Sequence, residues 1–190
     1  MNNIKTTLHL FYKNCDLKTQ KLFDEVSEQI CPDGYETIVE MNEFYVTKNK
    51  GSGSDLVFET PHVDGPFFFI PGVLLRCIYV IKGNDSVITH IPNQDFCKSL
   101  KEKEFCIFDY HRDIHWIEIK NNLDKNPRVV LKLHFIQKNH KILKHLSIIY
   151  NKIARFLFLN SIDKNFISII INKITNVYTF FIKKVLNKNR

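Results

Sequence analysis

Residues 60–66 read Thr60-Pro61-His62-Val63-Asp64-Gly65-Pro66. Successive side chains of an extended strand point to opposite faces, so His62 and Asp64 project from one side and Val63 from the other. Gly65 and Pro66 mark a turn directly after this pair. An imidazole beside a carboxylate at a strand end is a ligand pair suited to a metal ion, and the predicted fold is organised around it.

Short strand-like runs surround this stretch. They are apolar or alternating, and turn residues such as Gly, Pro, Asn and Asp separate them. They cover residues 35–47, 56–59, 67–70, 74–82, 86–91, 104–109, 113–119 and 128–136. Because no helical pattern lies between these strands, they predict a mainly β fold, either a sandwich or a jelly-roll barrel.

Helical periodicity is confined to the two ends of the chain. Asp16 is placed to cap a helix over residues 17–30, which Cys31-Pro32 ends. From His140 onward, two further amphipathic helices are predicted, with a break at residues 160–163. Their apolar stripes are Ile142, Leu146, Ile149, Ile153, Phe156 and Leu157 in the first, and Phe166, Ile169, Ile170, Ile174, Val177, Phe181 and Val185 in the second.

Charge divides the chain at the same point. Residues 1–137 carry 16 Lys/Arg and 19 Asp/Glu, whereas residues 138–190 carry 11 Lys/Arg and a single acid, Asp163. We therefore predict a jelly-roll domain over residues 1–137 and a basic helical tail over residues 138–190. The tail either packs on the barrel or on another subunit, or binds an anionic membrane surface. Nucleic acid is the least favoured partner, since no recognisable binding motif accompanies the basic residues.

Cysteine usage bears on the cellular compartment. The five cysteines form no C-x-x-C pair, and the N-terminus lacks the apolar core of a signal peptide. These features predict reduced thiols and a cytoplasmic protein, peripheral to a membrane if the tail binds one.

Two residues downstream extend the constellation around His62. His115 lies 51 residues after Asp64, within the run Phe108-Asp109-Tyr110-His111-Arg112-Asp113-Ile114-His115, and Arg128 opens the last predicted strand. Two histidines and one carboxylate are the facial ligand set of non-haem Fe(II). A guanidinium forks onto a carboxylate through two parallel hydrogen bonds, which suits Arg128 to an anionic ligand.

This order and spacing resemble the Fe(II)/2-oxoglutarate-dependent dioxygenases, over roughly residues 35–137. The Phe108-Asp109 segment before His115 looks most similar to the aspartyl/asparaginyl β-hydroxylase branch. That branch often lacks the carboxylate ligand, whereas Asp64 is present here, as in the wider superfamily. The resemblance implies a double-stranded β-helix, a jelly-roll of the cupin-like kind.

The resemblance also implies roles for these residues. His62, Asp64 and His115 would hold Fe(II), and Arg128 would bind the distal carboxylate of 2-oxoglutarate. With O2, such an enzyme hydroxylates a substrate and yields succinate and CO2. The substrate would be a protein Asp or Asn side chain, or an apolar, lipid-like molecule if residues 67–71 line the entrance.

Several assignments stay open at this point. His111 shares strand parity with His115 and is a second candidate for the distal ligand, although His115 is favoured. Arg128 has the alternative of a structural acid such as Glu118. Arg76 lies in an apolar strand and would bind either a cosubstrate or substrate carboxylate or a core acid such as Asp109. Tyr79 and Thr89 are weaker cosubstrate candidates, and Trp116 is expected in the core or the pocket wall.

The rival interpretation is a non-catalytic jelly-roll that binds or scaffolds a partner and is recruited to membranes by residues 138–190. In that interpretation His62 and His115 are structural residues. Neither the substrate nor the oligomeric state follows from the sequence.

Overall fold

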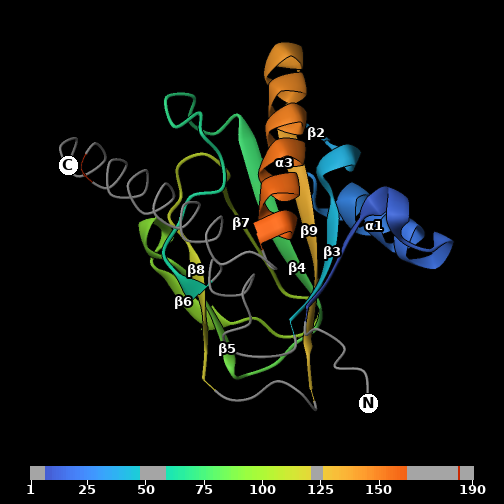
Figure 1. Ribbon diagram of the computed structural model, residues 1–190, viewed down its shortest axis with the longest axis vertical. Helices are drawn as coiled ribbons and strands as arrows, with labels where there is room; N and C mark the ends of the chain where they lie inside the picture. The colour runs from blue at the N-terminus through green and yellow to red at the C-terminus, as the bar shows by residue number, and fades with distance from the viewer. Residues whose placement is uncertain (1–6, 48–58, 121–125, 162–183, 185–190) are drawn as a thin grey trace.

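The computed structural model describes residues 7–47, 59–120, 126–161 and 184 (Figure 1). Their strands form two antiparallel sheets, one of six strands and one of three. The strands are β1 (Thr7–Phe11), β2 (Tyr35–Thr37), β3 (Glu43–Thr47), β4 (Leu74–Lys82), β5 (Val87–Ile91), β6 (Phe96–Ser99), β7 (Phe105–Asp109), β8 (Trp116–Ile119) and β9 (Arg128–Gln137). The helices are α1 (Leu17–Ile30) and α3 (Lys141–Ser161), with short 3-10 turns at Tyr12–Asn14, Val39–Met41 and Pro92–Gln94.

Strand β9 is the centre of the larger sheet. The strand order is β1-β3-β9-β4-β7, and β2 pairs with the far end of β9. β4 runs alongside β9 in a register that places Arg76 opposite His134 and Ile78 opposite Lys132. The smaller sheet has the order β6-β5-β8. The prediction of a mainly β fold is confirmed, whereas closure of the described strands into one barrel is not shown.

The two faces of β9 have different partners because its side chains alternate. Leu131, Leu133 and Phe135 pack with Phe23 and Val26 of α1 in one apolar cluster. Arg128, Val130 and Lys132 point the other way and line a pocket. One face of the sheet therefore packs against α1, and the other face lines a polar cavity.

Helix α1 begins and ends where the sequence indicates. The Asp16 carboxylate accepts a hydrogen bond from the Thr19 backbone N–H at 2.7 Å, as expected of an N-cap. The helix ends at Ile30, before Cys31 and Pro32. All five cysteines are free thiols.

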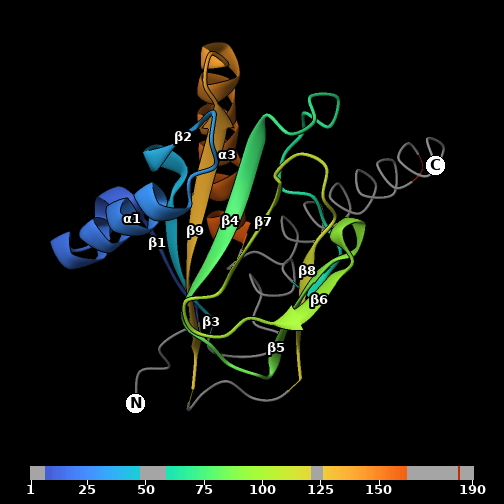
Figure 2. The same cartoon turned by 180° about the vertical axis from the view of Figure 1, so that it is seen from behind.

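Helix α3 covers the face of the large sheet opposite to α1. It lies in front of β4 and β9 in Figure 1 and behind them in Figure 2. Leu143 and Ile148 join an apolar cluster with Leu74 and Ile136. The predicted stripe of Ile142, Leu146, Ile149 and Ile153 is instead exposed. Docking of α3 therefore uses a face other than its predicted stripe.

Several predicted elements differ from the structure. Residues 35–47 are not one strand, because the Ile38 backbone N–H donates to the His134 carbonyl and a 3-10 turn at Val39–Met41 separates β2 from β3. Residues 67–70 form turns rather than a strand. β1 and β6 were not predicted.

Other predictions lie outside the described residues. These are most of the strand at 56–59, the second tail helix, and the side chains of Phe156 and Leu157. The domain division at residue 137 stays a prediction. Within the described residues, no helix has the length and apolar character needed to cross a bilayer.

Candidate metal centre and its pocket

His62 and His115 lie side by side because their backbones pair. The His62 N–H donates to the His115 carbonyl at 3.1 Å, and the His115 N–H donates to the His62 carbonyl at 2.9 Å. Their ring centroids are 4.4 Å apart. Asp64 follows two residues after His62, and the ligand atoms of all three residues lie within 4.8 Å of one another. The structure thus brings together the three residues predicted as ligands.

The two imidazoles are oriented by backbone carbonyls. His62 Nδ1 lies 2.7 Å from the Thr60 carbonyl oxygen, and His115 Nδ1 lies 3.1 Å from that of Asp113. A carbonyl oxygen only accepts, so each Nδ1 carries a proton and each ring turns its Nε2 toward Asp64. His115 Nε2 is 3.2 Å from Asp64 Oδ2, and His62 Nε2 is 3.8 Å from Oδ1.

This donor set fits a divalent transition metal. Ligands at about 2.1 Å from one ion and at right angles to each other are about 3 Å apart. The contact of Asp64 with His115 is close to this separation at 3.2 Å, and the contact with His62 is longer at 3.8 Å. Metal-bound histidines commonly donate their second N–H to a carbonyl, as both histidines do here. Fe(II) is among the ions that this combination of imidazole and carboxylate suits.

Electrostatics keep His62 and Asp64 in the protonation states that a metal requires. Burial, together with the nearby His115, lowers the pKa of His62 to about 3, so its imidazole is neutral at pH 7. Burial alone would raise the pKa of Asp64, but the Arg76 guanidinium and the neighbouring histidines outweigh it. The pKa of Asp64 is held well below its usual range, and the residue is a carboxylate.

The Arg76 guanidinium has an acidic partner, a histidine partner and an aromatic contact within the protein. Its NH1 group donates to Asp64 Oδ2 at 2.5 Å, and its Nε donates to His134 Nε2 at 2.9 Å. Its guanidinium also lies 4.8 Å from the centre of the Tyr110 ring. Asp109, the core acid predicted as an alternative partner, instead accepts from the Gly72 and His111 backbone N–H groups. The acid that meets Arg76 is therefore the candidate ligand Asp64.

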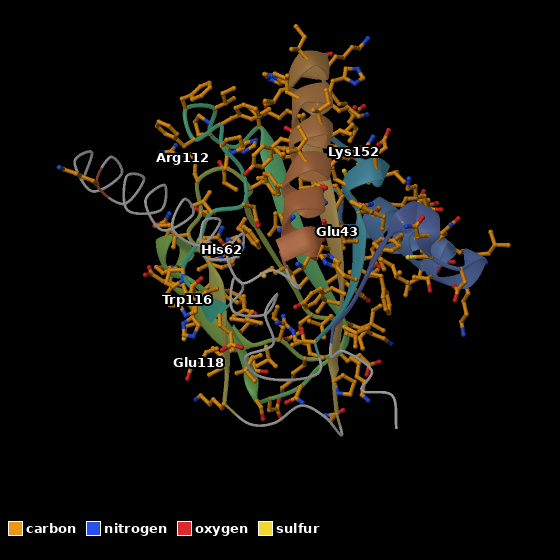
Figure 3. All side chains as sticks on the ribbon, viewed as in Figure 1. Glu43, His62, Arg112, Trp116, Glu118 and Lys152 are labelled. Atoms are coloured by element: carbon orange, nitrogen blue, oxygen red, sulfur yellow. The ribbon has the colours of Figure 1, made fainter. Side chains whose placement is uncertain are left out.

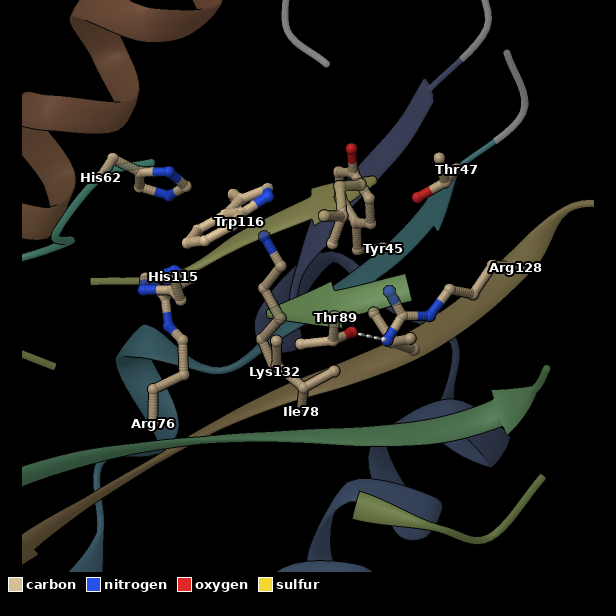
Figure 4. A pocket seen from close by; sticks show the side chains of 12 residues that line it. Tyr45, Thr47, His62, Arg76, Ile78, Thr89, His115, Trp116, Arg128 and Lys132 are labelled. Carbon is tan, nitrogen blue, oxygen red and sulfur yellow. Dashed lines mark hydrogen bonds between the residues drawn. The ribbon is translucent and has the colours of Figure 1, made fainter. Parts of the chain in front are cut away.

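One pocket extends from this cluster between the two sheets (Figure 4). His62, His115 and Arg76 lie at one end, Trp116 and Lys132 in the middle, and Thr89 and Arg128 toward the other end. Further lining residues are Tyr45, Thr47, Ile78, Ile117 and Val130. The pocket thus connects the metal end with a second polar end formed by β5 and β9.

Arg128 lies buried at this second end. Its NH2 group donates to the Thr89 hydroxyl at 3.2 Å, whereas its Nε has no hydrogen-bond partner among the described residues. Burial lowers the pKa of its guanidinium to about 10, which still leaves it charged at pH 7. Glu118, the predicted alternative partner, instead lies 3.1 Å from His90. No described acid forms an ion pair with Arg128.

The sequence analysis missed two buried polar residues of β9: Lys132, which lines the pocket, and His134, which contacts the pocket residue Arg76. Lys132 is buried, and its amino group lies 4.0 Å from Glu43 Oε2 and 4.4 Å from the centre of the Tyr45 ring. His134 is buried and accepts from Arg76. Both share the parity of Arg128 along β9, so strand alternation applied from Arg128 was the signal that identifies them.

The remaining candidates have different positions. Thr89 and Trp116 line the pocket, and Trp116 stacks on His90 with ring centroids 4.6 Å apart. Tyr79 lies on the opposite face of β4, in the cluster under α1, and is not brought to the pocket. Its odd spacing from Arg76 was the signal for this placement.

His111 is buried beside the metal end but outside the cluster of three ligands. Its Nδ1 accepts the Phe67 N–H at 3.5 Å, and burial lowers its pKa to about 4. A Cβ added at Gly65 would lie 2.0 Å from His111 Nδ1, so the turn after Asp64 has room only for glycine.

The aromatic run after the motif divides between two environments. Phe67 and Ile70 pack against the cluster that contains Leu143 and Ile148, whereas Phe69 is exposed. Phe68 packs with Val63 and Ile114. None of these residues lines the pocket.

Comparisons with known proteins give only weak likenesses. No protein-family model and no curated protein matches the chain. The epimerase SnoN, solved with Fe3+, alpha ketoglutarate and nogalamycin RO, is 12% identical over 70% of this chain and 64% of its own, with a TM-score of 0.47. EvdMO1 is 12% identical over 73% of this chain and 38% of its own, with a TM-score of 0.47.

The polyketide cyclase RemF from Streptomyces resistomycificus is 13% identical over 70% of this chain and 67% of its own, with a TM-score of 0.35. The chain thus spans about two fifths of EvdMO1 and less than two thirds of SnoN. At these identities the neighbours assign the chain to no family, and the argument for function rests on its own residues.

Proposed function

We propose that this protein is an Fe(II)- and 2-oxoglutarate-dependent oxygenase that hydroxylates its substrate. One observation carries the proposal: His62 and His115, which form a candidate metal cluster with Asp64, line the same pocket as Arg128, a buried cation that has no acidic partner among the described residues. A redox metal would be bound by the ligand cluster, and an anionic cosubstrate would provide the carboxylate that Arg128 lacks. The substrate class is a protein Asp or Asn side chain or an apolar, lipid-like molecule.

At the metal end of the pocket, hydrogen bonds within the protein orient the three candidate ligands. His62 and His115 present Nε2 because backbone carbonyls hold their Nδ1 protons. Arg76 orients the Asp64 carboxylate from the side of the core. Three protein ligands would leave open positions on Fe(II) for the cosubstrates. The bound metal and cosubstrate supply the oxidising chemistry, which the protein's own side chains lack.

At the other end, Arg128 would receive the distal carboxylate of 2-oxoglutarate, with the Thr89 hydroxyl beside it. A buried guanidinium without a counter-ion is costly, and a carboxylate would remove that cost through two parallel hydrogen bonds. We assign Lys132 no direct role here, since Glu43 and Tyr45 already hold its amino group.

The assignment to the aspartyl/asparaginyl β-hydroxylase branch is part of the proposal. It is supported by the Phe108-Asp109 segment, whose carboxylate braces the turn before His115 through the His111 N–H, while the Phe108 ring lies 4.3 Å from the His115 ring. A substrate search would therefore begin with peptides that contain Asp or Asn.

The test is an anaerobic titration of the purified chain with Fe(II) and 2-oxoglutarate, following the weak visible charge-transfer band of a chelated 2-oxo acid. We expect the band in the wild type and its loss in His62→Ala and Asp64→Ala. His90→Ala is the matched control, because His90 lies on β5 outside the pocket lining and should leave the band unchanged. A folded wild-type protein that gives no band overturns the proposal and leaves the non-catalytic scaffold.

A further inference from the structure

Helix α3 has apolar residues on two opposite sides. Leu143 and Ile148 are buried against the sheet, whereas Ile142, Leu146, Ile149 and Ile153 are between 46% and 79% exposed. The exposed residues are spaced by four, three and four positions, which places them in one stripe along the helix. Four large aliphatic side chains in one exposed row are a marker of an interaction surface.

The buried side already fixes the helix to the protein. Besides its apolar contacts, Asn151 donates to the Tyr110 hydroxyl at 3.4 Å, and Lys144 forms an ion pair of 2.8 Å with Glu36. The stripe of Ile142, Leu146, Ile149 and Ile153 is therefore not buried by the described residues. Because these side chains are apolar, we expect a further partner to cover them.

The charges around the stripe indicate the kind of partner. Lys141, His145 and Lys152 follow one edge of the stripe, at helical angles within about 110° of its centre. Lys152 is labelled on α3 in Figure 3. Residues 138–161 contain no acidic residue at all. An apolar row beside a basic edge is the pattern of helices that lie in the surface of an anionic bilayer.

We propose that this stripe docks on an anionic lipid bilayer, with the axis of α3 parallel to the membrane plane. Ile142, Leu146, Ile149 and Ile153 would enter the boundary of the acyl chains, and the basic edge would meet anionic headgroups. The surface is distinct from the metal pocket, and this proposal does not depend on the proposed catalytic function.

Charge argues against two other occupants of the stripe. A second copy of the chain would bring an equally basic α3 against this one, and like charges oppose such packing. The chain's own residues 162–190 carry six Lys/Arg and only Asp163, so they are basic as well. An anionic bilayer is the occupant whose charge complements the surface.

The experiment is co-sedimentation of the full chain with vesicles of pure phosphatidylcholine or of phosphatidylcholine with 30% phosphatidylserine. We expect the wild type to bind the anionic vesicles at least about tenfold more tightly and to release them in high salt, because screening weakens surface charge contacts. Equal partition into both vesicle types, or none, overturns the proposal.

Two exposed-site variants locate the contact. Ile149→Asp/Ile153→Asp should lower partition into anionic vesicles at least about tenfold, because it places charge in the stripe. Leu17→Asp is the matched control, since Leu17 is 83% exposed on α1, and it should bind like the wild type. Unchanged binding of the double variant overturns the assignment to this stripe.

Sedimentation velocity of the same proteins without lipid tests the second copy. We expect the wild type and Ile149→Asp/Ile153→Asp to sediment as the same species. A wild-type dimer that the double variant converts to a monomer would reassign the stripe to self-association. The Fe(II) and 2-oxoglutarate titration should be unchanged in the double variant, so the two proposals fail independently.

Discussion

Two arginines of the same pocket have opposite surroundings. Arg76 on β4 and Arg128 on β9 are both buried and both line the cavity between the sheets. Arg76 contacts Asp64, His134 and the Tyr110 ring. Arg128 has the Thr89 hydroxyl and no described acid.

This difference shows how a buried arginine with a structural role can be distinguished from one that binds a ligand. A buried guanidinium is stable only with a partner, so the question is whether the protein itself supplies one. At Arg76 the protein supplies Asp64, and the arginine orients a metal ligand. At Arg128 the partner has to come from outside the described residues. Substitutions at the two arginines should therefore separate fold stability from cosubstrate binding.

The largest effect is expected from Arg76→Leu. Asp64 would be left as a largely buried carboxylate without its counter-ion, which costs about 3–5 kcal/mol of the free energy of unfolding. Urea denaturation measures that loss, and Fe(II) titration should show weaker metal binding. The double variant Arg76→Leu/Asp64→Leu should regain much of the stability but no metal binding. A single variant as stable as the wild type would mean that the pair does not organise the site.

Arg128→Met should act in the opposite way. Removing a buried charge that no described acid compensates should leave the free energy of unfolding unchanged or raised. Loss of a buried charge partner costs about 2–5 kcal/mol of binding, so the Kd of 2-oxoglutarate should rise by roughly 30-fold or more. The charge-transfer titration measures this Kd. Arg112→Met, at an arginine outside the pocket lining, is the control, and equal effects of both variants would remove Arg128 from the site.

Gly65→Ala tests the position of Asp64 without changing any charge. The new methyl group would meet His111 and the Tyr110 ring, where Cβ contacts of 2.0 and 2.6 Å are predicted. Overpacking of this kind costs about 1–3 kcal/mol and should displace Asp64 from Arg76 and from the histidines. Thermal denaturation and Fe(II) affinity are the measurements.

Gly72→Ala is the control for the Gly65 variant. Gly72 has a positive φ of 70° but open space for a Cβ, so alanine there should cost only backbone strain of about 1–2 kcal/mol. Fe(II) affinity should survive in this variant. Equal loss of Fe(II) affinity in both would show that general destabilisation, rather than the position of Asp64, is responsible.

The smallest effect is expected from Thr89→Val. This nearly isosteric change removes the side-chain hydrogen bond that Arg128 forms with the Thr89 hydroxyl among the described residues. Such a bond contributes about 0.5–1.5 kcal/mol, so the Kd of 2-oxoglutarate should rise by roughly 2- to 12-fold with stability almost unchanged. An effect larger than that of Arg128→Met would contradict the assigned roles.

The sequence by itself determined the local features of this protein. The period of two along a strand placed His62 and Asp64 on one side, and the Asp16 cap with the Cys31-Pro32 stop bounded α1. The same alternation could also have placed Lys132 and His134 on the face of Arg128, and Tyr79 on the face opposite to Arg76, but the sequence analysis did not apply it there. These features depend on neighbours a few residues apart, which a single sequence contains.

Only the tertiary structure decided which distant groups meet. Arg76 lies 58 residues from His134 and 12 from Asp64 in the sequence. The register of β4 against β9 brings Arg76 to His134, and the turn after Asp64 brings it to Asp64 rather than to Asp109. Likewise Ile142, Leu146, Ile149 and Ile153 of the predicted apolar stripe of α3 are exposed, because the sheet packs against Leu143 and Ile148 instead. Periodicity shows that a face is apolar, whereas the shape of the facing surface decides whether that face is buried.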